Sequence, residues 1–119
     1  MIHILNDSWK LNDCNRNLVI NCKSVYSYIK FKDIQFSNVH ISLIGYKELE
    51  SICNDNIRYL RADITKPVIL AKNMENPDMK KYRMIDGRHR LKKIINNGEN
   101  VIKAYILDRD EILKFVLAL

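Results

Sequence analysis

Apolar and polar positions along the chain separate into short stretches with the periods of strands and helices. β-branched and aromatic residues alternate partly with polar ones over residues 25–31 and 36–44, so both stretches are predicted to be extended. Apolar positions recur at helical spacing over residues 46–53, which predicts a helix. Residues 67–71 form an apolar run that predicts a buried strand, with Pro67 at the first position, where a strand tolerates proline.

The second half of the chain continues these patterns. Residues 82–85 and 101–107 are predicted to be strands, and residues 88–97 to be a helix with one apolar stripe. The spacing of Asp108 and Glu111 is that of a capping box, which predicts the start of a last helix. Together these elements predict a small α+β fold with a mixed sheet and helices.

A chain of 119 residues fits one domain. We expect residues 36–119 to form it and residues 1–35 to be an amino-terminal extension that packs on it. The last eight positions, from Ile112 to Leu119, are too apolar to remain in water. They are expected to cover the sheet or to meet another subunit, so a homodimer through this tail is predicted.

The composition of the chain indicates where in the cell the protein works and what kind of genome encodes it. The chain has no run of about 18 apolar residues, so no membrane span is expected. Its three cysteines are odd in number and form no Cys-x-x-Cys pair, which indicates reduced thiols in a cytoplasmic protein. The abundance of isoleucine, asparagine and lysine is typical of an AT-rich genome, such as that of a phage or a low-GC bacterium.

Positive charge is concentrated in one short segment. Residues 79–93 hold seven basic residues and a single acid, a balance equal to the whole net charge of +6. Such a local field favours a partner that carries phosphate, although a solvated basic face would show the same composition.

The centre of this segment is a strand that feeds through Asp86 and Gly87 into a helix. Glycine permits an unusual backbone angle and a close approach, and the first amides of the helix are free to converge on an anion. Three cations follow at the positive end of the helix dipole, where each is unfavourable by about 0.3–1 kcal/mol unless an anion compensates. They are Arg88, His89 and Arg90. A phosphate would compensate them, with Arg90 holding it through its planar fork.

Asp86 and His89 each allow more than one role. Asp86 can be the helix N-cap, accepting from the amide of His89, or it can be a metal ligand or a base for a hydroxyl nucleophile. His89 can donate to phosphate, act as a general acid or base, or simply pack in the fold. Both are therefore candidate catalytic residues, and Thr65 and Lys66 are expected to lie near the phosphates.

The order of these parts over residues 36–119 resembles the ParB/sulfiredoxin superfamily. ParB amino-terminal domains have a similar strand-Gly-x-Arg-Arg-helix motif, of which Gly87 and Arg90 match, while Arg88 and His89 replace its glutamate and first arginine. Sulfiredoxins have Gly-Cys-His-Arg, and Arg88 replaces that cysteine, so sulfinic-acid reduction does not fit. The Asp-Gly-x-His-Arg form also resembles ParB-like kinases that phosphorylate a free amino acid.

The resemblance implies a nucleotide-binding domain that takes a nucleoside triphosphate with Mg²⁺, as ParB takes CTP. The family's later Glu-Asn-x-x-Arg motif and its helix-turn-helix domain have no counterpart in these 119 residues, so centromere-like DNA recognition is not implied. No two-metal carboxylate cluster is evident in the sequence, which argues against nuclease activity.

Two functions follow from these observations. The first is a phosphate- or nucleotide-binding domain at residues 86–90, with NTP hydrolysis or phosphoryl transfer as the associated activity. The alternative is a non-enzymatic, phage-encoded binding protein that contacts nucleic acid or a host protein through its basic surface. The side chains expected on that surface are Lys80, Lys81, Arg83, Lys92 and Lys93. A relative that keeps the fold and has lost the ligand would show the same motif.

Overall fold

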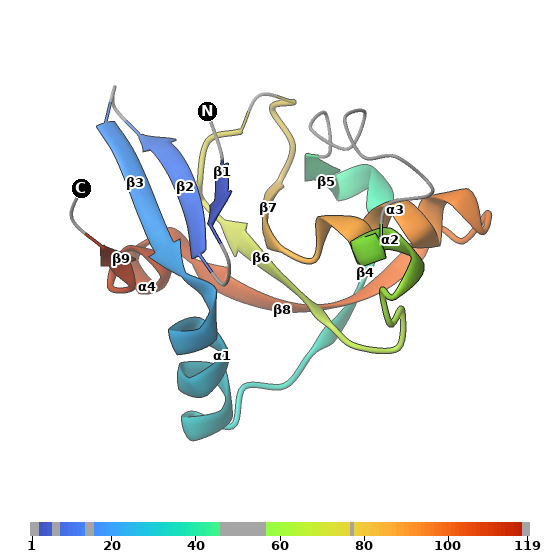
Figure 1. The fold of residues 1–119 in the computed structure, drawn as a ribbon, viewed down its shortest axis with the longest axis horizontal. Helices are drawn as coiled ribbons and strands as arrows, with labels where there is room; N and C mark the ends of the chain where they lie inside the picture. Colours follow the sequence, from blue (N-terminus) through green and yellow to red (C-terminus); the bar gives the residue numbers. More distant parts are fainter. Residues whose placement is uncertain (1–2, 6–7, 14–15, 46–56, 77, 118–119) are drawn as a thin grey trace.

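Two sheets organise the chain (Figure 1). The computed structural model describes residues 3–5, 8–13, 16–45, 57–76 and 78–117. Strands β1, β2, β3 and β9 form an antiparallel sheet in that order, and β4, β8, β6, β7 and β5 form a mixed sheet in that order. The first sheet comprises β1 (His3–Leu5), β2 (Ser8–Asp13), β3 (Arg16–Asn21) and β9 (Val116–Leu117). The second comprises β4 (Ser37–His40), β5 (Ile44–Gly45), β6 (Val68–Lys72), β7 (Tyr82–Asp86) and β8 (Val101–Asp108).

The described residues also form four α-helices and one 3-10 turn. They are α1 (Cys22–Phe31), α2 (Ile57–Leu60), α3 (Arg88–Asn96), α4 (Arg109–Leu113) and the turn η1 (Ile41–Leu43). The α+β class and the mixed sheet predicted from the sequence are therefore confirmed. The helix predicted over 46–53 lies outside the described residues.

Strand β6 lies at the centre of the mixed sheet because its sequence is apolar on both faces. Its first four residues are buried, and it runs parallel to β8 and antiparallel to β7. Strand β8 alternates exposed and buried positions over its first half and crosses the molecule from α3 to α4 (Figure 1). The strands predicted over 67–71, 82–85 and 101–107 are confirmed within one residue at each end.

The largest difference from the sequence prediction is α1, which occupies residues 22–31 where an extended stretch over 25–31 was predicted. The buried side chains Cys22, Val25 and Ile29 follow helical spacing, and Asn21 accepts from the amide of Ser24 as an N-cap. The extended prediction was wrong because burial of side chains at this period of three to four residues outweighs the strand preference of β-branched and aromatic residues. The second extended stretch, 36–44, is a strand over 37–40 and again at Ile44, where β5 begins, with the turn η1 between them.

The amino-terminal and carboxy-terminal segments are joined by direct contacts. Strand β3 pairs with β9, and Val25 and Ile29 of α1 belong to the same hydrophobic cluster as the strands of the mixed sheet. The expected capping box is present, with Asp108 and Glu111 bonding at the start of α4. That helix ends at Leu113, so the tail is not one long helix.

Part of the carboxy-terminal tail packs on this chain. Ile112 is fully buried, and Phe115 packs on Tyr28 with ring centroids 5.2 Å apart. These two residues therefore join the core, and the predicted homodimer stays a prediction. No helix within the described ranges is long and apolar enough to cross a membrane.

Candidate functional site

The connection from β7 to α3 is a single glycine. Gly87 is the N-cap of α3, with φ +109° and ψ +23°, and its carbonyl accepts from the amide of Leu91 at 2.9 Å. Because the N-cap is a glycine, it contributes no side-chain capping bond. The interpretation of Asp86 as the N-cap is therefore wrong. As at any helix start, the first amides of α3 have no partner among the carbonyls of the helix itself.

The glycine at this turn is required by packing as well as by its backbone angle. A Cβ on Gly87 would lie 2.4 Å from Cγ1 and 2.8 Å from Cβ of Val68, the first residue of β6. The space beside the glycine is thus filled by the neighbouring strand. A ligand approaching this turn would meet the helix amides instead of the glycine face that Val68 covers.

The carboxylate of Asp86 belongs to a three-residue network. Its Oδ2 accepts from the Tyr26 hydroxyl at 2.6 Å and from Nη2 of Arg90 at 3.2 Å, and the same Nη2 lies 3.1 Å from the Tyr26 hydroxyl oxygen. The ion pair is only partly exposed, at 17 % for Arg90 and 28 % for Asp86. The network joins α1 to both sides of the glycine turn.

The second arm of the Arg90 guanidinium bonds to backbone. Its Nη1 donates to the carbonyl of Pro67 at 2.6 Å and approaches that of Lys66 at 3.4 Å, just before β6 begins. The planar fork expected to hold phosphate therefore holds a carboxylate, a hydroxyl and two carbonyls of this chain. Arg90 fixes the position of the turn relative to β6 and α1.

Tyr26 was missed by sequence reasoning. Burial first, and then the charge of Asp86, raise the pKa of its hydroxyl far above the ordinary tyrosine value, so that it stays a donor at any physiological pH. A tyrosine sixty residues from its partner leaves no signal in local motifs. Only a correct helix at residues 22–31, with Tyr26 on the face toward the turn, would have indicated it.

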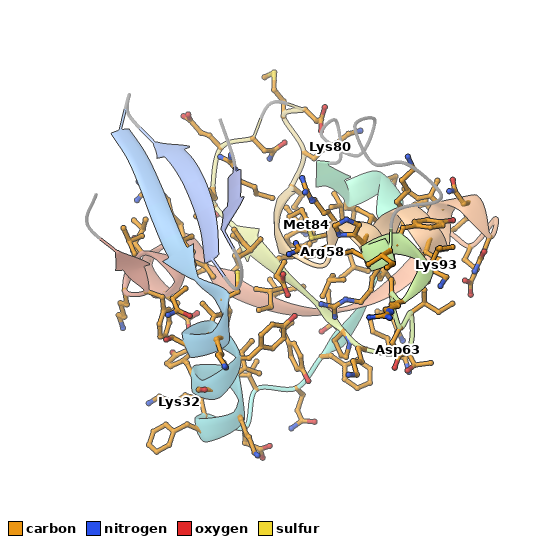
Figure 2. The ribbon with its side chains drawn as sticks, in the orientation of Figure 1. Lys32, Arg58, Asp63, Lys80, Met84 and Lys93 are labelled. Atoms are coloured by element: carbon orange, nitrogen blue, oxygen red, sulfur yellow. The ribbon has the colours of Figure 1, made fainter. Side chains whose placement is uncertain are left out.

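Three cationic or titratable side chains gather at the start of α3. Arg88 and His89 are its first two residues, and Arg58 of α2, labelled in Figure 2, lies close enough for its charge to act on His89. Desolvation is the main cause that lowers the pKa of His89, and the charges of Arg88 and Arg58 lower it further. His89 is therefore neutral at pH 7, and an anion beside it would raise its pKa. Arg58 was not singled out from the sequence because it lies thirty residues away.

Thr65 and Lys66 lie in the turn that precedes β6. Asp63 accepts from the hydroxyl of Thr65 at 2.5 Å and from its amide at 3.0 Å, and the carbonyl of Asp63 accepts from the amide of Lys66 at 3.1 Å. The two bonds from Thr65 to the carboxylate lower the pKa of Asp63. The turn is held against the helix start by Arg90, through the carbonyl of Lys66.

The five basic residues expected on a nucleic-acid surface have different environments. Lys80 and Lys81 are exposed, whereas Arg83 is 9 % exposed and donates to the carbonyl of Glu75 at 2.7 Å. Lys93 donates to the backbone carbonyls of Leu60, at the end of α2, and of Ala62, at 2.9 and 3.2 Å. Lys92 is half-buried on α3. The set does not form one continuous exposed face.

A protein-held Mg²⁺ does not fit this site. Oδ2 of Asp86 already accepts from two donors, one of them a guanidinium, which makes it a poor metal ligand. Within the part of the chain that the structure describes, no three His, Cys, Asp or Glu side chains gather where they could hold a metal. A magnesium ion would have to arrive on the phosphates of a nucleotide.

Comparison of the chain with protein-family models, with curated proteins and with solved structures found no match. The resemblance to the ParB/sulfiredoxin superfamily therefore stays a prediction. The function has to be argued from the geometry at the start of α3.

Proposed function

We propose that the start of α3 binds the phosphate groups of a nucleotide or of another small phosphate ligand. The observation that carries this proposal is the convergence of three features at one point: a helix start whose N-cap is a glycine, two arginines and a neutral histidine. Each cation at this end of a helix is unfavourable by about 0.3–1 kcal/mol in the absence of an anion. A bound phosphate would accept from the amides and offset the repulsion.

The residues of the site have two proposed roles: some contact the phosphate, and others hold the glycine turn in position. Arg88, His89 and Arg58 are the proposed contacts, because they lie at the helix start. Asp86 and Arg90 are positioning residues, because they bond to each other, to Tyr26 and to the backbone before β6. Hydrolysis or transfer of a phosphoryl group would require His89 as the proton-transfer group, since Asp86 is already held by two donors.

The finer fold assignment is also a proposal. The order β6, β7, glycine turn, α3 and β8 follows the order of parts on which the ParB/sulfiredoxin resemblance rests. This agreement supports a ParB-like nucleotide domain, with Arg90 in a different role from the phosphate fork expected of the motif.

Calorimetric titration tests the proposal. CTP, ATP, GTP, inorganic triphosphate and a short DNA duplex are titrated into the protein at two salt concentrations, with and without magnesium. We expect inorganic triphosphate and at least one nucleotide to bind. The variant Arg88→Gln should weaken that binding roughly ten- to a hundredfold, the usual loss of one charge-assisted hydrogen bond.

The matched control is Lys114→Gln, which removes one exposed positive charge after α4, across the molecule from α3 (Figure 1). It should bind as the unaltered protein does. Equal losses in both variants would show that only net charge matters. Binding to the duplex alone, fading steeply with salt, would contradict the phosphate site and favour the nucleic-acid alternative.

A further inference from the structure

A cleft of about 520 Å³ lies between α1, the segment that follows it and β8. This volume is within the range of small-molecule sites. Its apolar lining is formed mainly by residues that precede β4, together with one side chain of β8. These residues are Tyr26, Ile29, Ile34, Phe36 and Tyr105. The cleft is lined by different residues from those proposed to contact phosphate.

Three of the lining residues are aromatic, and they present ring surface. Tyr26 turns its hydroxyl away to Asp86 and Arg90, so its contribution to the cleft is its ring. Phe36 is 45 % exposed, and Nζ of Lys103 lies 5.3 Å from its ring centroid. Aromatic walls favour a planar ring as the occupant, because rings stack or pack edge to face on one another.

The polar side of the cleft is built at the carboxy-terminal end of α1. The amide of Asp33 donates to the carbonyl of Lys30 at 3.2 Å, and that of Ile34 donates to the carbonyl of Ile29 at 3.0 Å. These are the two bonds of a Schellman motif, in which glycine normally occupies the left-handed position. Here Asp33 occupies it, with φ +53°.

Aspartate at this position is unfavourable twice over. A non-glycine residue in the left-handed region carries backbone strain, and a carboxylate at the carboxy-terminal end of a helix opposes the helix dipole. Both Asp33 and Gln35 are exposed, and Gln35 donates to Oδ1 of Asp33 at 3.1 Å. Asp33 lines the cleft together with Gln35 and Lys30. A carboxylate that can accept a hydrogen bond thus lies beside the aromatic side chains of the cleft.

We infer that this cleft binds a planar heteroaromatic ring that carries an amino group, such as the base of adenosine or cytidine. The ring packs among Tyr26, Phe36 and Tyr105, and the amino group donates to the carboxylate of Asp33. The inference does not depend on phosphate binding at α3, because a nucleoside without phosphate supplies all of the chemistry that the cleft would recognise.

Nucleosides are the probes that test it. Adenosine and cytidine are compared with inosine and uridine, which lack the amino group, by calorimetry and by nitrogen–proton correlation spectra of the whole chain. We expect the two amino-bearing nucleosides to bind about five- to tenfold more tightly, as for one hydrogen bond to a partly exposed charged group. Their spectral shifts should centre on Tyr26, Phe36 and Tyr105.

Two variants complete the test. Asp33→Gly removes the carboxylate acceptor, and glycine is the residue favoured in the left-handed conformation, so this variant should fold and lose the preference for amino-bearing rings. Tyr105→Leu should weaken all four nucleosides at least about fivefold by removing a stacking surface. Glu99→Gln changes an exposed charge just after α3, and it should alter neither the preference for amino-bearing rings nor the affinity for the four nucleosides.

The inference is overturned if adenosine and cytidine fail to bind at millimolar concentration. It is also overturned if Asp33→Gly keeps the preference or if the spectral shifts lie elsewhere. Inorganic triphosphate tests the α3 site separately, so failure of either site can be told from failure of the other.

Discussion

The glycine turn before α3 provides a quantitative test of the structure. Replacing Gly87 with alanine forces a side chain into φ +109°, which costs about 1–3 kcal/mol. The new Cβ would also lie 2.4 Å from Cγ1 of the fully buried Val68, and overpacking of this kind costs about 1–3 kcal/mol more. Gly87→Ala should therefore lower the free energy of unfolding by about 2–6 kcal/mol, a large share of the stability of a small domain.

Gly98→Ala is the matched control, because Gly98 also has a positive φ, +77°, yet nothing lies within 4 Å of its added Cβ. It should show the backbone cost alone. Unfolding in urea, followed by circular dichroism, measures both variants and the double variant Gly87→Ala with Val68→Ala. The second substitution removes Cγ1 but keeps the Cβ at 2.8 Å, so it should recover only part of the overlap cost. The two changes should be non-additive by about 1–2 kcal/mol. Equal losses at the two glycines, or additive changes, would refute the described packing.

Three further predictions concern the network, the histidine and the last helix. Tyr26→Phe should lower stability by about 1–3 kcal/mol through the lost bond to Asp86. Because the folded state raises the pKa of Tyr26, the contribution of its hydroxyl to stability is complete below pH 10 and is lost as the pH rises above that. Urea unfolding at a series of pH values should show this loss of stability in the unaltered protein alone. An identical dependence on pH in the variant would contradict it. Proton NMR should place the pKa of His89 below 6.5 and move it upward on addition of inorganic triphosphate, whereas an unmoved value would argue against contact. Asp108→Ala should lower the melting temperature by about 3–6 °C through loss of the capping box, and Asp110→Ala, at an exposed position, should lower it less.

Much of the carboxy-terminal half could be predicted from the sequence, because local signals and tertiary structure agree there. The apolar run of β6, the Asp108 capping box and the stop at Gly98 each correspond to an observed element. The stop is a Schellman motif, with Glu99 and Gly98 donating to the carbonyls of Ile94 and Ile95.

The amino-terminal third was harder because its local preferences conflict. Residues 22–31 are rich in residues that favour strands, but packing of Val25 and Ile29 into the core selects a helix. Strands β1, β2 and β3 pair as successive hairpins, and β3 also pairs with β9 near the other end of the chain. That last pairing is long-range and leaves little trace in any short window.

The backbone structure of the candidate site could be predicted from the sequence, but the hydrogen bonds of its side chains could not. The segment 86–90 is indeed a strand-glycine-helix turn with cations at its start. The roles of Arg90 and Asp86 could not be read from the sequence, because their partner Tyr26 lies on a helix that local patterns misassign. The same holds for Arg58, which reaches the site only because α2 lies beside α3 (Figure 1).

The most direct test of the account is where inorganic triphosphate binds. Nitrogen–proton correlation spectra of the whole protein would be recorded during its addition at pH 7. Phosphate binding at the start of α3 predicts saturable shifts that are largest at the amides of Arg88 and His89 and absent in Arg88→Gln. Shifts confined to the exposed lysines at positions 80 and 81, or no saturable shift, would contradict it.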